Sequence, residues 1–303
     1  MKCLITNFAG VEFKNPIVAA SGTFGFGREY GKFYDLSHLG GICVSGITVT
    51  ARPGNMPPRI AETPMGVLNS VGLQNPGVDA FITNELPNLY EYDVVKIINI
   101  SGNTTYEYVE ITEKLSDTKM DIIEVNVSCP NVKSGGMQFG VSKENVFAVT
   151  QEVKKRSAVP VIIKLTPNVT DITEIAKAAE DAGADGISMI NTVLGMRIDI
   201  NSRKPILSNN VGGLSGPAIF PIAVRMVWQV ANAVKIPILG MGGITKGEDS
   251  IEMMLAGASL IGIGTANFKD PYAPLTNIKY LSKYCEDNNI NNISDIVGKV
   301  IPN

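Results

Sequence analysis

Two side chains in this sequence have a type and a place suited to chemistry, Lys164 and Cys129. Lys164 ends an almost wholly apolar run in VIIKLTPN, and a lysine on a buried strand is costly without an anionic partner. It could hold a group that becomes negative during turnover; the alternative is a lysine that extends to the rim. Cys129 in NVSCPN could be a reactive thiol, although most lone cysteines are buried fillers.

Two glycine-rich stretches indicate an anion site: GMGGI (240–244) and GIGTA (262–266). Glycines let backbone N–H groups come close to an anion, and a helix N-terminus adds a favourable dipole. We therefore expect a phosphate group here, with simple tight turns as the alternative.

Asn69, in GVLNSVGLQNPG (66–77), could pair with the amide edges of a pyrimidine or a flavin, or it could be an ordinary turn residue. His38, the only histidine, precedes the second predicted strand, so we expect a structural role and a different catalytic base. Cys3, Cys43 and Cys285 are expected to be fillers.

Eight short apolar runs alternate with helix-length segments, a pattern typical of parallel strands buried on both faces. The predicted strands are Pro16–Ala20, Gly41–Val44, Val94–Ile100, Ile122–Val127, Val161–Leu165, Gly186–Ile190, Ile236–Gly240 and Leu260–Ile263. The clearest predicted helices are Asn145–Arg156, Thr170–Ala182, Pro217–Ala233 and Glu248–Ala256. Eight units favour a closed (β/α)8 TIM barrel over an open doubly wound sheet. We expect one domain over residues 1–303, with an N-terminal hairpin and inserted loops at 46–76 and 191–216.

Each predicted strand has a polar residue or glycine at or directly after its end, where a barrel enzyme places its site. These residues are Ser21-Gly22, Ser45-Gly46, Asn99, Asn126, Lys164, Asn191-Thr192, Gly242-Gly243 and Gly264-Thr265. We expect them to share one rim.

The composition excludes several classes of protein. A net charge of −3 argues against nucleic acid and anionic membranes as partners. The N-terminus has no signal-peptide core, no apolar run is long enough to span a membrane, and the four cysteines form no CxxC pair. We therefore expect a cytoplasmic protein without a metal site.

At these residues the chain resembles the class 1 dihydroorotate dehydrogenases, over nearly its whole length. The stretches that carry the resemblance are ASGTFGFG (20–27), RPGNMPPRIAETPMGVLNSVGLQNPG (52–77), NVSCPN, KLTPN, INTVLGMRID (190–199), GGLSGPA (212–218), GMGGI and IGIGTANF (261–268). Cys129 points to class 1, and FGFG, INTVLGMRID and GTANF resemble the NAD-linked (type B) branch.

The resemblance implies bound FMN and oxidation of dihydroorotate to orotate in pyrimidine synthesis. The FMN-binding residues it implies are Ser21, Gly22, Ser45, Gly46, Asn99, Asn126, Lys164, Ile190, Gly216, Gly242, Gly243, Gly264 and Thr265. The substrate-binding residues it implies are Ser45, Asn69, Ser70, Val71, Gly72, Leu73, Asn126, Asn191 and Thr192. It also implies a homodimer core within a heterotetramer, whose second subunit carries FAD and a 2Fe-2S cluster and passes electrons to NAD.

One position departs from the family pattern. Where the family usually has a lysine that touches both flavin and the orotate carboxylate, this chain has Ser45; Arg197 or Lys133 could supply that charge instead. The expected mechanism has Cys129 as the base at substrate C5, hydride transfer from C6 to FMN, and Lys164 stabilising the reduced flavin. The alternatives are a flavoprotein for another dihydropyrimidine, a flavin-free phosphate-binding isomerase or lyase, and a non-catalytic scaffold.

Overall fold

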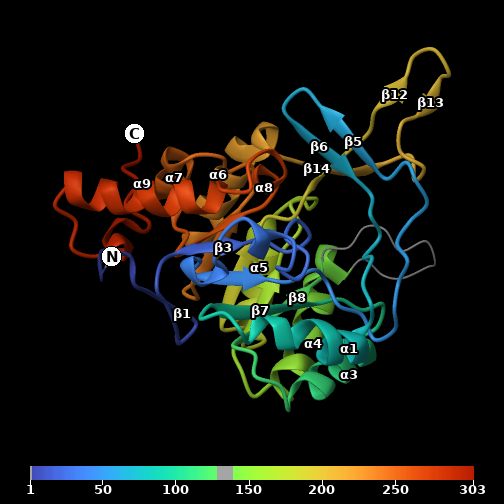
Figure 1. Cartoon of the computed structure of the whole chain (residues 1–303), viewed down its shortest axis with the longest axis horizontal. Coiled ribbons are helices and arrows are strands. Elements are labelled where there is room, and N and C mark those ends of the chain that lie inside the picture. The colour runs from blue at the N-terminus through green and yellow to red at the C-terminus, as the bar shows by residue number, and fades with distance from the viewer. Residues whose placement is uncertain (1, 128–138) are drawn as a thin grey trace.

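The structure, a computed structural model, describes residues 2–127 and 139–303. Eight parallel strands form a closed barrel in the order β3-β4-β7-β8-β9-β10-β15-β16. Figure 1 shows β3, β7 and β8 in the middle of the molecule, with helices outside them. Their bounds are β3 Ile17–Ala19, β4 Gly41–Cys43, β7 Val95–Ile100, β8 Ile122–Asn126, β9 Val161–Lys164, β10 Gly186–Met189, β15 Ile238–Met241 and β16 Leu260–Ile263. Each coincides with a predicted strand to within two residues at either end, so the predicted TIM barrel is confirmed.

Helices surround the barrel. The longer ones are α3 Thr105–Leu115, α4 Lys143–Lys154, α5 Ile172–Asp181, α6 Phe220–Ala231, α7 Gly247–Ala256 and α9 Ala273–Asp287. Short helices are α1 Val78–Ala80, α2 Leu86–Leu89 and α8 Ala266–Lys269. The start of α5 follows from its sequence, because the Asp171 side chain accepts a hydrogen bond from the Thr173 backbone N–H. The helices bury their apolar faces against the outside of the barrel.

The barrel interior is a separate apolar core, closed at its bottom by the predicted N-terminal hairpin of β1 Thr6–Phe8 and β2 Val11–Phe13. The rings of Phe8 and Phe13 meet edge to face with centroids 6.2 Å apart. Glycines on the strands make room for them. A Cβ at Gly186 would lie 3.0 Å from Phe8, and one at Gly41 would lie 2.9 Å from Phe13.

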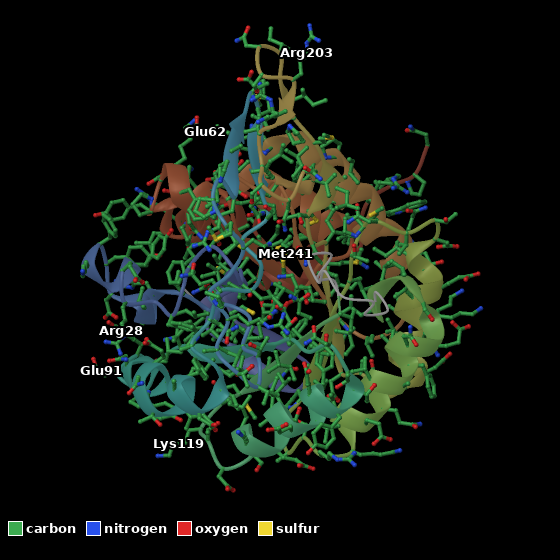
Figure 2. All side chains as sticks on the ribbon, turned by 90° about the vertical axis from the view of Figure 1, so that its right-hand side faces the viewer. Arg28, Glu62, Glu91, Lys119, Arg203 and Met241 are labelled. Atoms are coloured by element: carbon green, nitrogen blue, oxygen red, sulfur yellow. The ribbon has the colours of Figure 1, made fainter. Side chains whose placement is uncertain are left out.

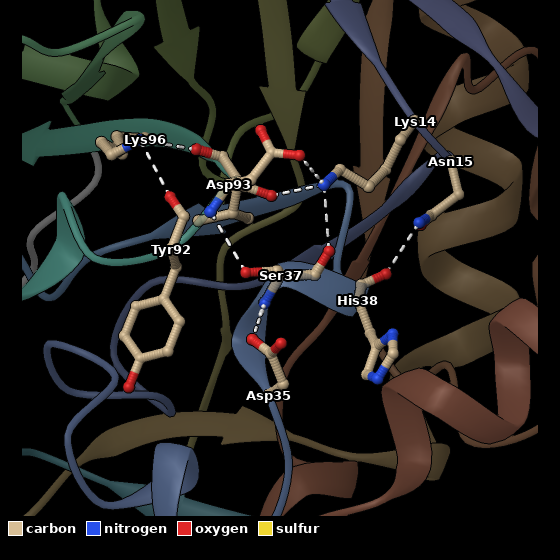
Figure 3. A network of polar contacts seen from close by, with 9 residues as sticks. Lys14, Asn15, Asp35, Ser37, His38, Tyr92, Asp93 and Lys96 are labelled. Carbon is tan, nitrogen blue, oxygen red and sulfur yellow. Dashed lines mark hydrogen bonds and ion pairs between the residues drawn. The ribbon is translucent and has the colours of Figure 1, made fainter.

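A polar network ties this hairpin to the segments that precede β4 and β7 (Figure 3). The Lys14 ammonium donates to the carbonyl of Ser37 at 3.0 Å and to the Asp93 carboxylate at 2.7 Å. The Asn15 amide donates to the carbonyl of His38 at 2.9 Å. His38 therefore lies at the amino ends of the strands, as predicted, and its backbone serves the fold.

The two long segments predicted as loops contain strands. β5 Ile60–Thr63 and β6 Gly66–Asn69 from the first segment join β11 Val193–Gly195 and β14 Gly212–Ser215 from the second in an antiparallel sheet, ordered β11-β14-β6-β5. A further hairpin, β12 Ile198–Asp199 and β13 Lys204–Pro205, extends from it. Figure 2 shows Arg203 at the outer tip of this hairpin and Met241 near the centre of the molecule. The insertions are present as predicted, but their strands were not predicted, because β6 pairs with β14, more than 140 residues away, and a local pattern does not show such a pairing.

No helix in the described part of the chain combines the length and the apolar character needed to cross a membrane.

Candidate active site

A cavity lies at the carboxyl ends of the barrel strands, between them and the four-stranded sheet. Strands β6 and β14 supply its roof through Val67, Asn69, Gly213 and Ser215. The predicted rim residues that line it are Ser21, Gly22, Ser45, Gly46, Asn126, Lys164, Asn191, Thr192, Gly242, Gly243, Gly264 and Thr265. Ile190 and Gly216 line it as well. The structure thus brings the predicted strand-end residues together, apart from Asn99.

The two glycine stretches form one wall of this cavity. At Gly243 the backbone has φ +81°, and a Cβ would lie 2.8 Å from the carbonyl oxygen of Gly216 and from the backbone nitrogen of Phe220. At Gly264 the nearest described atom to a Cβ would be 3.8 Å away, so a side chain there would extend into the cavity. Backbone therefore forms this wall, as close approach of an anion requires.

Lys164, at the end of β9, contributes the only charged side chain among the described residues that line the cavity. Its side chain is 6% exposed, and its ammonium lies 3.6 Å from the carboxylate of Glu124 on the neighbouring strand β8. Glu124 is fully buried. The lysine is therefore part of a buried ion pair whose positive end faces the cavity.

Neighbours of Glu124 keep its carboxyl group ionised. Burial by itself raises the pKa of this carboxyl, but the Lys164 ammonium and the polar hydrogens of Ser188, Asn99 and Cys43 outweigh it and leave the pKa below its ordinary value. The Cys43 thiol donates to Oε1 of Glu124 at 3.2 Å. Burial, then the Glu124 charge, raises the pKa of that thiol well above its ordinary value, so Cys43 remains a neutral donor.

Asn99, in β7, is fully buried and does not line the cavity. Its amide nitrogen donates to Glu124, with which it pairs in register. Gly46 packs on its other side, where a Cβ would lie 2.8 Å from the Asn99 amide oxygen. In this structure Asn99 lies level with Glu124 and binds its carboxylate instead of lining the cavity.

Amides and backbone groups form a second part of the lining, including the roof. The Asn69 amide donates to the carbonyl of Gly213 at 3.4 Å, and the Asn191 side chain accepts from the Thr192 backbone at 2.8 Å. The turn of Gly72 and Leu73 has φ values of +81° and +56°, and the Asn75 amide fixes it by donating to the Leu73 carbonyl at 2.7 Å. This part of the lining offers donors and acceptors without charge, as planar amide edges of a ligand require.

Several residues considered from the sequence lie elsewhere. Ser70 is fully buried and does not line the cavity, whereas its neighbour Val71 does. Arg197 does not line the cavity either, and its guanidinium donates to the backbone carbonyl of Glu62. Cys129 and Lys133 lie outside the described residues.

Comparison with known proteins assigns the chain to a family. The sequence model of dihydroorotate dehydrogenase matches residues 3–283. The chain belongs to the dihydroorotate dehydrogenase family. It is 56% identical to the "Dihydroorotate dehydrogenase B (NAD(+)), catalytic subunit" of Alkaliphilus oremlandii, over 97% of each chain. The subunits of the same name from Thermoanaerobacter pseudethanolicus, at 55% over 96% of each chain, and Halalkalibacterium halodurans, at 53% over 98%, are similarly close.

The cavity of this member of the dihydroorotate dehydrogenase family also contains polar residues that were not predicted. Gln74, Ser215 and Thr245 line it. Gln74 lies inside the GLQNPG motif and Thr245 directly follows the first glycine stretch, so both could have been predicted from those motifs. Glu124 was missed because the run Ile122–Val127 reads as apolar; a charged residue inside it was the available signal.

Proposed function

We propose that this chain oxidises dihydroorotate to orotate in pyrimidine synthesis, using FMN bound in the cavity at the carboxyl ends of the strands. The observation that carries the proposal is the arrangement of this cavity. Lys164 supplies a cation at its floor, glycine backbone forms one wall, and uncharged amides form a second part of the lining. Family membership, with relatives named as catalytic subunits of this dehydrogenase, gives the arrangement its reaction.

The residues present fit FMN. Gly264 has no side chain between backbone and cavity, Gly243 lines the same wall, and both stand where barrel enzymes hold a phosphate. We assign the phosphate to these two loops, with Thr265 as a hydroxyl donor. Ala20, Ile190 and Met241 supply the apolar surface that a flat ring needs. When bound, FMN supplies the two-electron chemistry by accepting the hydride of substrate C6.

With FMN bound, Lys164 would place a positive charge at the cavity floor, available to negative charge that develops on the ring. A fixed cation in a site that excludes water stabilises such charge without reorganisation. The ion pair with Glu124 and the enclosing strands β8 and β10 fix the ammonium before the substrate arrives.

We assign the proton abstraction at substrate C5 to Cys129. It follows Asn126, the last residue of β8, by three residues in sequence, and Asn126 lines the cavity. Among the described cysteines, Cys43 and Cys285 are buried, and burial raises the pKa of both thiols. Neither is suited to act as a thiolate.

The substrate binds against the amide part of the lining. Asn69, Asn126 and Asn191, with Thr192 and the backbone of the Gly72–Leu73 turn, present the donors and acceptors that match the ring amides of dihydroorotate. Ser45 offers a hydroxyl to the substrate carboxylate. Because Ser45 brings no charge, a flavoprotein that oxidises another dihydropyrimidine is the second candidate.

Two measurements on the purified chain test this function. Flavin released by heat and identified by chromatography should be FMN in a one-to-one ratio, and dihydroorotate should reduce an artificial dye with orotate as the product. A cofactor other than FMN would overturn the assignment of the phosphate loops. Dye reduction by dihydrouracil but not by dihydroorotate would favour the second candidate.

We further propose that NAD is reached through a partner subunit that carries FAD and a 2Fe-2S cluster, in a heterotetramer built on a dimer of this chain. The relatives' name, catalytic subunit, supports a partner. The chain alone should reduce NAD slowly, and coexpression with an iron–sulfur flavoprotein should restore the rate. Rapid NAD reduction by the chain alone would contradict the need for a partner.

A further inference from the structure

Below the floor of the cavity lies a buried carboxylate, Glu124, which contacts no part of the cavity itself. Glu124 lies two residues before Asn126 on β8, so both side chains face the barrel interior and Glu124 is one layer deeper. Lys164 pairs in register with Asn126 on one side and with Ser188 on the other. Glu124 therefore lies one layer below Lys164, level with Asn99 and Ile162 on the two adjacent strands. Lys164 lies between Glu124 and the cavity.

The packing of the barrel does not call for an acidic residue here. The interior below is filled by apolar side chains, among them Ile97, Ile122 and Ile162. A buried carboxylate is strongly disfavoured by desolvation, and replacing a buried ion pair as a whole by apolar residues of similar volume is often neutral or stabilising. The negative charge of Glu124 is the property that an apolar residue could not supply, and Lys164 at 3.6 Å is its partner.

We propose that Glu124 is a positioning residue for the flavin chemistry: it is the counter-ion that keeps Lys164 protonated and fixed while the flavin ring is neutral. This inference rests on the proposed function. The oxidised ring is uncharged, so without Glu124 the lysine would be a cation enclosed against a neutral surface. With Glu124 the cation is already present when electrons reach the ring.

The number of protons taken up when the flavin is reduced should depend on Glu124. With Glu124 present, two electrons and one proton, taken up at the ring, leave one negative charge that the existing ammonium faces. In Glu124→Gln, we expect Lys164 to release its proton in the oxidised state and to regain it on reduction. Reduction of the variant would then take up two protons, one at the ring and one at Lys164.

The other side chains around the Lys164–Glu124 pair are mostly uncharged. Strand β4 contributes the Cys43 thiol, β7 contributes Asn99 and β10 contributes Ser188. Strands β15 and β16 contribute the uncharged Leu239, Met241 and Leu260. Residues 128–138, outside the described part, contain no Asp or Glu. Glu124 is thus the carboxylate of the described residues that lies beside Lys164, and the titratable groups of residues 128–138 to control for are the Cys129 thiol and the Lys133 ammonium.

The pH dependence of the flavin midpoint potential measures this balance. Each proton taken up changes the equilibrium tenfold per pH unit, which is about 30 mV for a two-electron couple. Dye-equilibrated potentials between about pH 6 and 10 should fall by about 30 mV per unit in the parent and by about 59 mV per unit over part of the range in Glu124→Gln. Both proteins should carry Cys129→Ala and Lys133→Met, which remove the thiol and the second ammonium. The matched control is Glu113→Gln, whose carboxylate is 60% exposed in a surface pair with Arg156.

A slope of about 30 mV per unit throughout in Glu124→Gln would overturn the proposal, because Lys164 would then keep its proton without the carboxylate. If Glu124→Gln does not fold or bind flavin, the apoprotein supplies the test. A stability cycle compares Glu124→Gln, Lys164→Met and the double variant, with no flavin present. The double variant should unfold at a higher temperature than Lys164→Met alone. If the two single variants lose stability additively in the double variant, Lys164 and Glu124 do not stabilise each other and the proposal fails. This test does not depend on flavin. A parent protein that binds no flavin would refute the proposed function instead.

Discussion

Replacing Ser45 by lysine tests how this chain recognises the carboxylate of its substrate. Ser45 follows β4, its backbone N–H donates to the carbonyl of Gly25 at 3.1 Å, and it lines the cavity. Lys164 is the only charged side chain that the described residues contribute to the cavity, and Glu124 already balances its charge. A second ammonium at position 45 would therefore be available for the carboxylate of orotate.

The magnitude follows from the change in bond type. A hydrogen bond to a charged group contributes about 1.5–3 kcal/mol, against about 0.5–1.5 kcal/mol for a neutral one. The change from one bond type to the other is worth about 1–1.5 kcal/mol. Since a factor of ten in Kd corresponds to about 1.4 kcal/mol, Ser45→Lys should tighten orotate binding by about five- to twelvefold. If the serine has only removed a useful lysine, with no other change in the site, Ser45→Lys should also reduce the flavin faster.

Orotate is titrated into the oxidised protein while the visible flavin spectrum is followed. Ser45→Met is the matched control, because it adds a side chain of similar length without a charge. The reasoning is refuted if Ser45→Met tightens binding as much as Ser45→Lys does, or if the parent already binds orotate as tightly as the lysine variant. Lower activity on dihydroorotate in Ser45→Lys would mean that the site is rebuilt around the serine.

Three further predictions concern the pair and the base. Cys129→Ala should lower the rate of flavin reduction by dihydroorotate about 10²- to 10⁴-fold while FMN stays bound, and Cys129→Ser should be slow but faster at high pH; a stopped-flow rate equal to the parent's would assign the base elsewhere. Lys164→Ala should slow flavin reduction and weaken FMN retention on dialysis, whereas parental behaviour would make Lys164 only a rim lysine. Loss of the Glu124 charge in Glu124→Gln should lower the free energy of unfolding by about 3–5 kcal/mol near neutral pH. Because the folded-state pKa of Glu124 is lowered, its contribution is fully present above the unfolded pKa of about 4.3 and is lost as the pH falls through the folded value. Urea unfolding of parent and variant should therefore converge in acid, and a gap that widens in acid would contradict the ion pair.

The barrel could be predicted because its information is local. Each strand is a short apolar run that ends in a polar residue or glycine, and runs such as Val161–Leu165 coincide with observed strands almost residue by residue. Helix α5 is similar, since Asp171 caps its start and Gly183, with φ +93°, follows its end. The shared rim then follows from the parallel topology alone.

Non-local features could not be predicted in this way. The sheet that roofs the cavity pairs Asn69 with Gly213, and no window of sequence contains both. The same reason explains Asn99 and Glu124. Asn99 and Glu124 lie opposite each other on adjacent strands. Asn99 therefore donates to the Glu124 carboxylate instead of lining the cavity. Ser70 shows the period of two, because its neighbours Asn69 and Val71 line the cavity and Ser70 is buried behind them.

Anaerobic addition of dihydroorotate to the purified chain, without any partner, tests the central claim most directly. The protein should be yellow as isolated. Dihydroorotate should bleach its visible flavin absorbance, with one orotate formed for each FMN reduced. A correctly folded chain that is colourless and does not take up added FMN would contradict the account. So would a flavin spectrum that dithionite bleaches and dihydroorotate leaves unchanged.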